Sequence, residues 1–257
     1  MNCIQFRKEP ETEFSTETST DAVSTDSDTS AGTVCESFTE TTLNILKNTF
    51  ELLFTAQSWL LSPLFLCAGF SMSLYSGIFP TAIGNTKSFN DAASFLGLVG
   101  ILVGVGHIIA GLSFMLVSTW MSKANKTLLL LFFFTIQLFG VVLILINIPN
   151  DANQNETHAA PLVLSSPNKP VALIAAVLLG FSDAGINNVI YTSIPLIWKD
   201  NTLPAFSLFK LFQNSAGAIS FAIAAEINLF QYLGLLIGIG SIALVCFLIL
   251  QIRQSQC

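Results

Sequence analysis

The chain has 257 residues, of which 52% are hydrophobic and only 10% are charged. A soluble domain of this size cannot keep so much apolar surface away from water, so the composition indicates an integral membrane protein whose main partner is the lipid bilayer. The formal net charge is -6, but nine of the 16 acidic residues lie in the first 42 positions, and the remainder is nearly balanced. Because the sequence has no basic stripe interleaved with aromatic residues, nucleic-acid binding is excluded.

The N-terminal part changes character near residue 42. Residues 1–41 are rich in Ser, Thr, Glu and Asp and have few large apolar side chains, which predicts a disordered cytosolic tail. Residues 42–57 instead place apolar side chains at helical spacing and polar ones largely on the other side, which predicts an amphipathic helix in the membrane interface. The apolar positions are Leu43, Leu46, Phe50, Leu53 and Phe54.

Apolar segments make up most of residues 58–252. Six of them follow one another, at about 59–80, 93–118, 127–148, 170–195, 203–225 and 229–250. Each is close to the ~20 residues that a helix needs to cross ~30 Å of hydrocarbon. The sequence therefore predicts an all-α, multi-pass membrane protein with six transmembrane helices.

Basic residues set the expected orientation. Most of those that flank the segments lie at one end of the predicted bundle, which predicts that both termini are cytosolic; they are Lys47, Lys123, Lys126, Lys199 and Arg253. The long connection over 149–169 then lies on the lumenal or extracellular side. It contains Asn155-Glu156-Thr157, an acceptor sequence for N-glycosylation. The sequence favours neither the plasma membrane nor an endolysosomal membrane.

The segment at 93–118 carries glycines and a histidine. Gly97, Gly100 and Gly104 include a Gly-x-x-x-Gly pair, which lets a neighbouring helix approach closely and predicts a packing face. His107 lies ~20 Å from the outer end of this segment by helical rise. Two roles stay open for it: shuttling protons, or a neutral side chain hydrogen-bonded to another helix.

Polar stripes run through the segments at 170–195 and 203–225. The first contains Asp183, Asn187 and Asn188, and the second Lys210, Gln213 and Asn214. Charges cost several kcal/mol in hydrocarbon, so these side chains are candidates to line a protein interior or a watery cavity.

The depths of the two charges argue against a direct ion pair between them. Asp183 lies ~20 Å and Lys210 ~10 Å from the cytosolic boundary at ~1.5 Å per residue. Lys210 either reaches the level of Asn187 or snorkels to the interface along its aliphatic stem. Asp183 has no such escape, so it is expected to be protonated, hydrogen-bonded or in contact with water.

Motifs of catalysis and of metal binding are absent from the sequence. It has no nucleophile elbow, no P-loop and no His-Glu-x-x-His pattern, and its five cysteines lack the spacing of metal ligands. We therefore expect no enzyme activity, no catalytic residue, no metal and no cofactor.

The two stripes resemble the uncoordinated-93-like family of the major facilitator superfamily, in particular its eleventh major facilitator domain-containing subfamily. Gly180-Phe-Ser-Asp183 with Asn187 matches one family pattern, and a second is matched by Ala205, Phe206, Phe209, Lys210 and Gln213. The resemblance covers about residues 43–251 and implies spans seven to twelve of a twelve-span fold, that is, one half of it. Such folds bind substrate near midplane between two bundles.

This resemblance implies a solute-transporter-like function for a partial chain, with the second six-span bundle supplied from elsewhere. Asp183 would then be the candidate for proton coupling, and the polar residues of both stripes would line the central cavity. The family also implies an alternative, a non-transporting regulatory or trafficking subunit for an ion channel or a receptor. In that case the partner would be a channel or receptor membrane subunit that docks on the stripes.

Overall fold

The computed structural model describes residues 42–89, 92–120 and 126–255. The chain divides into a unit over Met1–Thr42, nearly all of it outside the described residues, and a unit over Leu43–Cys257 that holds the helices. The tail predicted over 1–41 therefore lies outside the described part. In the described residues the regular elements are helices, and β-type pairing is limited to a bridge between Thr86 and Thr157. The predicted all-α fold class is confirmed.

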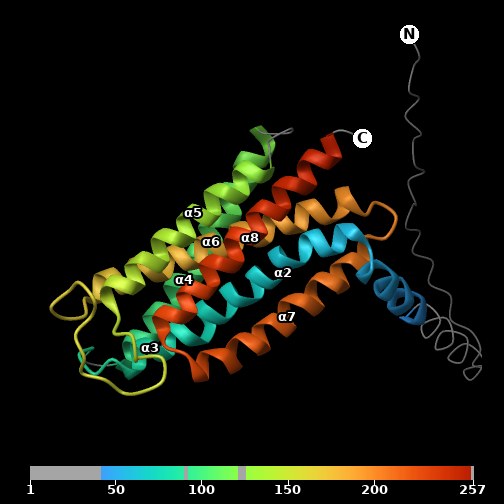
Figure 1. The fold of residues 1–257 in the computed structure, drawn as a ribbon. Coiled ribbons are helices and arrows are strands. Elements are labelled where there is room, and N and C mark those ends of the chain that lie inside the picture. Colours follow the sequence, from blue (N-terminus) through green and yellow to red (C-terminus); the bar gives the residue numbers. More distant parts are fainter. Residues whose placement is uncertain (1–41, 90–91, 121–125, 256–257) are drawn as a thin grey trace, which may run out of the picture. The chain divides into compact units, whose positions relative to one another are not determined.

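Long helices follow one another along the chain (Figure 1). The first is a rod in three parts, which are α2 (Ala56–Ser73), a π-helical turn η1 (Leu74–Ile78) and α3 (Phe79–Asn85). The others are α4 (Ala92–Trp120), α5 (Lys126–Asn147), α6 (Lys169–Ile197), α7 (Thr202–Glu226) and α8 (Leu229–Ser255).

Five helices of the described chain are long and apolar enough to cross a membrane, where six were expected. They are the rod of α2, η1 and α3, together with α4, α5, α6 and α8. The 25 residues of α7 are also long enough, since they span ~37 Å. Its polar residues, among them Lys210, Gln213 and Asn214, lower its hydropathy. The passage of α7 through the membrane therefore stays a prediction.

Helices α2 and α6 lie at the centre of the bundle. Helix α2 packs against α7 and α8, while α6 packs against α4 and α5 (Figure 1). Glycines make the closest approaches possible, because a Cβ added to Gly180 would lie 2.2 Å from the Val103 carbonyl oxygen. A Cβ on Gly106 would lie 2.3 Å from the Val177 carbonyl oxygen. The backbones of α4 and α6 therefore touch at these two glycines.

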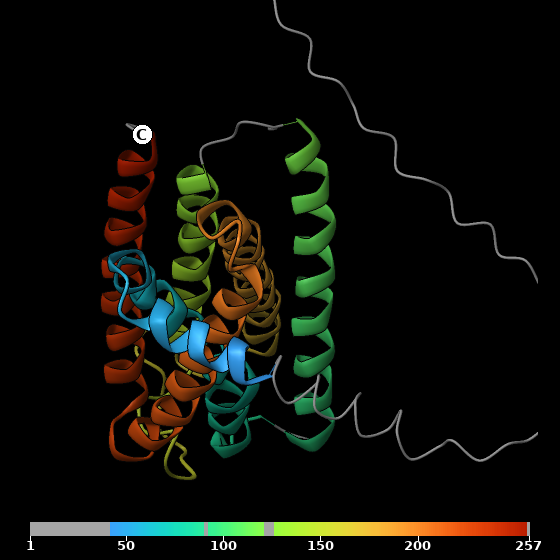
Figure 2. The same ribbon diagram turned by 90° about the vertical axis from the view of Figure 1, so that its right-hand side faces the viewer.

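The predicted packing glycines lie elsewhere on α4. A Cβ added to Gly97, Gly100 or Gly104 would meet nothing within 4 Å. At ~100° per residue these three positions point roughly opposite to Gly106, on the side of α4 that faces away from α6 (Figure 2). They pack against no helix of the described residues, because the spacing of glycines predicts a smooth face but does not tell which neighbour covers it.

Residues 42–53 form a separate helix before α2. Its Leu43, Leu46 and Phe50 are 64%, 58% and 67% exposed, as an apolar face turned toward lipid requires. The helix stops earlier than the predicted residue 57 because Thr55 is the N-cap of α2, where its side chain accepts a hydrogen bond from the Ser58 amide. Its position in the membrane interface stays a prediction.

The long loop after α5 holds one end of the bundle together. Asn147 and Asn168 clamp its base, with the Asn168 amide donating to Asn147 Oδ1 over 2.7 Å. Asn153 donates to the carbonyl oxygens of Ala224 and Ile227, where α7 ends and its backbone acceptors have no helical partner. The loop thereby fixes the end of α7 relative to α5 and α6.

The predicted glycosylation sequence lies in this loop. Asn155 is exposed, whereas Thr157 is 7% exposed and its amide donates to the Asn85 carbonyl oxygen over 2.9 Å. Lys87 forms an ion pair of 2.8 Å with Glu156 beside it. Glycosylation of Asn155 stays a prediction.

Candidate functional site

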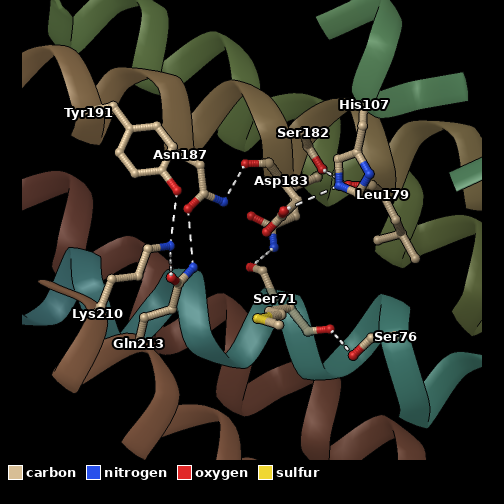
Figure 3. Close-up of polar contacts among 12 residues, drawn as sticks. Ser71, Ser76, His107, Leu179, Ser182, Asp183, Asn187, Tyr191, Lys210 and Gln213 are labelled. Atoms are coloured by element: carbon tan, nitrogen blue, oxygen red, sulfur yellow. Dashed lines mark hydrogen bonds and ion pairs between the residues drawn. The ribbon is translucent and has the colours of Figure 1, made fainter. Parts of the chain in front are cut away.

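The Asp183 carboxyl group lies inside the bundle and contacts His107. Asp183 is only 5% exposed. Its Oδ2 atom lies 3.4 Å from His107 Nε2, and this contact joins α6 to α4 (Figure 3). The other carboxyl oxygen, Oδ1, is buried and makes no hydrogen bond within the described residues. A buried carboxyl oxygen without a partner is costly, because it has lost water and gained no donor.

The π-helical turn η1 supplies the aromatic neighbour of this pair. The Tyr75 and His107 rings meet edge to face with their centroids 5.1 Å apart, and the Tyr75 side chain also lies near the Asp183 carboxyl group. A π-helical turn inside an α-helix is rare and is frequent at functional sites, because it redirects a side chain.

Two hydrogen bonds link the Asp183 backbone to α7, and a third continues to Lys210. Asn187 Nδ2 donates to the Asp183 carbonyl oxygen over 2.9 Å, and Gln213 Nε2 donates to Asn187 Oδ1 over 3.1 Å. Lys210 Nζ then donates to Gln213 Oε1 over 2.7 Å (Figure 3). A charged group, two amides and a backbone carbonyl thus form one continuous chain across the α6–α7 contact.

Lys210 determines which way each amide in this chain of hydrogen bonds is oriented. An ammonium group can only donate, so Gln213 must turn its oxygen toward Lys210 and its nitrogen toward Asn187. Asn187 must then turn its oxygen toward Gln213 and its nitrogen toward the Asp183 carbonyl. Lys210 is itself held by the Tyr191 hydroxyl at 3.0 Å and by the rings of Tyr191 and Phe209, whose centroids are 5.3 Å and 4.7 Å away.

A second buried amide lies on α5. Gln137 is 2% exposed, and its Nε2 donates to the Ser71 hydroxyl of α2 over 2.5 Å. Its Oε1 is buried and makes no hydrogen bond within the described residues. Polar side chains from α2, η1, α4, α5, α6 and α7 therefore form one layer inside the bundle, which we call the polar layer. Its members are Ser71, Tyr75, His107, Gln137, Asp183, Asn187, Tyr191, Lys210 and Gln213.

The structure brings together most of the candidate residues singled out in the sequence. His107, Asp183 and Asn187 meet on one side of the polar layer, while Gln213 and Lys210 complete it. The remaining two lie outside the chain of bonds, since Asn188 is half-buried and Asn214 is exposed. In the described residues no ion pair joins Asp183 to Lys210, and the two amides connect them instead.

Sequence reasoning missed Ser71, Tyr75 and Gln137. The signal for Gln137 was present, because a lone amide within an apolar helix must find a partner in the bundle. Ser71 and Tyr75 gave no comparable signal, since hydroxyl groups are common in membrane helices and the π-helical turn has no sequence mark that we recognise.

Access to the polar layer is uneven. Asp183, Asn187 and Gln213 are buried, whereas Lys210 is exposed and the His107 side chain is 32% exposed. The exposed Lys210 and the partly exposed His107 thus lie at opposite ends of the layer, and the buried carboxyl group lies between them (Figure 3). Among the described residues no three His, Cys, Asp or Glu side chains gather as metal ligands would.

Long apolar helices around a buried polar layer define a multi-pass membrane protein. The chain belongs to the UNC-93 family, because the family model described as ion channel regulatory protein UNC-93 matches residues 8–248. The predicted resemblance is thereby confirmed.

Curated relatives agree with this assignment. The chain is 28% identical over 221 residues to the UNC93-like protein MFSD11 of Xenopus tropicalis, a match that covers 83% of this chain and 49% of the relative. It is 27% identical to the protein of the same name from Xenopus laevis, covering 83% and 48%. The chain thus spans about half the length of the curated relatives it matches. No solved structure matches it.

Proposed function

We propose that the chain forms one half of a solute-transporter-like membrane protein, in which Asp183, Asn187, Lys210 and Gln213 line the path of a small polar solute. The polar layer carries this proposal, because membrane helices bury a carboxyl group and a lysine-led chain of amides only at a cost. In such folds the solute site lies near midplane at the face shared by two bundles. The opposite wall would come from a second six-span bundle.

Within this function, Asp183 takes up and releases the coupling proton. It is the one carboxyl group of the polar layer, and it contacts His107, whose side chain is partly exposed. Its unpartnered Oδ1 supports this role, because an oxygen without a fixed donor is free to carry a proton. Lys210, which is already bonded to Gln213 and Tyr191, instead holds the amides in place to bind the solute.

The exchange of Asp183 for Asn tests this role. The full chain and the variant are reconstituted in vesicles that contain a pH-sensitive dye, at a density at which a second copy can supply the opposite wall. A mixture of amino acids, nucleosides and hexoses is added outside. We expect solute-dependent proton movement with the original chain and its loss in Asp183→Asn, at equal amounts of inserted protein. Asp200→Asn, an exchange of an exposed loop aspartate, serves as the matched control and is expected to behave like the original. Unchanged proton movement in Asp183→Asn would contradict the proposed role of Asp183 in proton coupling.

The family description favours a second candidate function. The matching family model is that of an ion channel regulatory protein, so the exposed α7 end of the polar layer is alternatively a docking face for a membrane subunit of a channel or receptor. Lys210 and Asn214 would then make contacts with a helix of that subunit.

The same preparation separates the two functions. A chain that purifies without a membrane partner and moves protons with solute supports transport. A stoichiometric membrane partner that is lost on Lys210→Met, from a chain that moves no solute in vesicles, supports the regulatory role.

A further inference from the structure

Among the residues that the structure describes, two buried oxygen atoms of the polar layer have no hydrogen-bond donor. They are Asp183 Oδ1 on α6 and Gln137 Oε1 on α5, in residues that are 5% and 2% exposed. An unsatisfied buried acceptor is costly, so a pair of them at one site calls for a common explanation.

The register of α5 against α6 places these two atoms at the same level. A Cβ added to Gly140 would lie 3.3 Å from the Leu179 side chain, and one added to Gly185 would run into the Phe133 ring. Gln137 lies between Phe133 and Gly140 on the same face of α5, because it is four residues after the first and three before the second. It therefore faces the stretch of α6 between Leu179 and Gly185, which contains Asp183.

Helix α2 gives an independent measure of the same position. Ser71 points from α2 toward Asp183 (Figure 3), and its hydroxyl group is the partner of Gln137 Nε2. The Gln137 amide is thus bonded to a group that is directed at the carboxyl. The register of α5 against α6 and the bond to Ser71 both indicate that the Gln137 amide lies next to Asp183.

We propose that Gln137 and Ser71 are a positioning pair that keeps the Asp183 carboxyl group hydrogen-bonded in both of its protonation states. With Asp183 neutral, its Oδ1–H donates to Gln137 Oε1, and Gln137 Nε2 donates to the Ser71 hydroxyl. The bond from Gln137 Nε2 to Ser71 is present in the structure, and in this state one proton satisfies both unpartnered oxygens.

With Asp183 ionised, the Gln137 amide turns over about its last side-chain bond. Its Nε2 then donates to Oδ1, and the Ser71 hydroxyl donates to Oε1, since a hydroxyl group both donates and accepts. The proton that leaves Oδ1 passes to a water molecule on the open side of His107. No buried oxygen of the pair lacks a partner in either state, so the carboxyl can gain and lose a proton without opening the bundle.

Few other titratable groups face this carboxyl. They are His107 on α4, Tyr75 on η1, Cys67 on α2 and Lys210 on α7. At this level α5 presents Gln137, which does not titrate, and the Lys126 amine at its start bonds the Thr192 carbonyl oxygen near the far end of α6. The coupling role of Asp183 rests on the proposed function, but the positioning by Gln137 does not.

Infrared difference spectroscopy of the purified full chain in lipid nanodiscs, between low and high pH, tests the pair. We expect the band of a neutral carboxyl group together with a side-chain amide change, both of them absent in Asp183→Asn. In Gln137→Met, which keeps the size of the side chain, we expect the amide change to vanish and the carboxyl band to move to higher frequency. Gln231→Met on the exposed start of α8 is the control and should match the original chain.

Retention of the amide change in Gln137→Met, or an unmoved carboxyl band, would overturn the proposal. If that variant does not fold, Ser71→Ala gives the second test, because it removes only the hydroxyl group that exchanges roles with the amide. An amide change unaltered in Ser71→Ala overturns the proposal equally. The spectra require no solute movement, so failure of the proposed function and failure of the pair are seen separately.

Discussion

Replacing Gly180 with alanine is expected to destabilise the bundle by about 1–3 kcal/mol or more, the range for overpacked cores. The added Cβ would lie 2.2 Å from the Val103 carbonyl oxygen and 2.9 Å from its carbonyl carbon. Backbone cannot rotate away as a flexible side chain can, so α4 and α6 must separate. Thermal unfolding of the purified protein, followed by size-exclusion chromatography after heating, measures the effect.

Gly100→Ala is the matched control for this prediction. It lies on the same helix as the contact at Gly106, but a Cβ there meets nothing within 4 Å. Alanine is the better helix former, so this variant is expected to unfold at the same temperature as the original chain or slightly above it. Equal losses in Gly180→Ala and Gly100→Ala would contradict the close approach of α4 and α6 at Gly180.

Replacing Gln213 with leucine is expected to break the chain of hydrogen bonds at its middle. The exchange leaves the buried Asn187 Oδ1 without a donor and removes one of the two acceptors of Lys210. An unsatisfied buried acceptor costs about 1–3 kcal/mol in proteins, although hydrogen bonds measured within membranes average only ~0.6 kcal/mol. We therefore expect the free energy of unfolding to fall by about 0.6–3 kcal/mol. Denaturant titration in detergent measures this change.

The neighbouring Asn214 provides the comparison. It is an exposed amide one position further along α7 and lies outside the chain of bonds. Asn214→Leu is therefore expected to leave the unfolding free energy unchanged. A loss as large as that of Gln213→Leu would mean that α7 does not tolerate an extra leucine at all, and that the hydrogen bonds of Gln213 do not decide its stability.

The sequence predicted the apolar helices well, because membrane spans leave a long and simple signal. The segment expected at 170–195 corresponds to α6 over Lys169–Ile197, for example. The stripes of Asp183 and Lys210 were also visible, since charges in apolar runs are rare. Depth estimates further indicated that these two side chains do not meet directly. The structure connects the Lys210 amine to the Asp183 backbone carbonyl through Gln213 and Asn187.

The partners across the bundle were not visible in the sequence. Periodicity tells which side chains share a face of one helix but not which helix lies opposite, so Gly97 and Gly100 were expected to pack and lie open instead. The contact of Asp183 with His107 depends on the register of α6 against α4, which the close approach at Gly106 and Gly180 sets. This register follows from three-dimensional packing, and no pattern in the amino-acid sequence indicates it.

Thiol accessibility along α7 tests most directly whether the polar layer opens to water. Lys210 and Leu211 are adjacent and both exposed in this chain, Leu211 by 58%, but they point in directions ~100° apart. Each is changed to cysteine in a chain whose five native cysteines are replaced by alanine. A charged, water-soluble thiol reagent is then added to membranes that contain the chain. Our account predicts rapid labelling at position 210 and none at position 211, which faces lipid. Absence of labelling at position 210, or equal labelling at both, would contradict it.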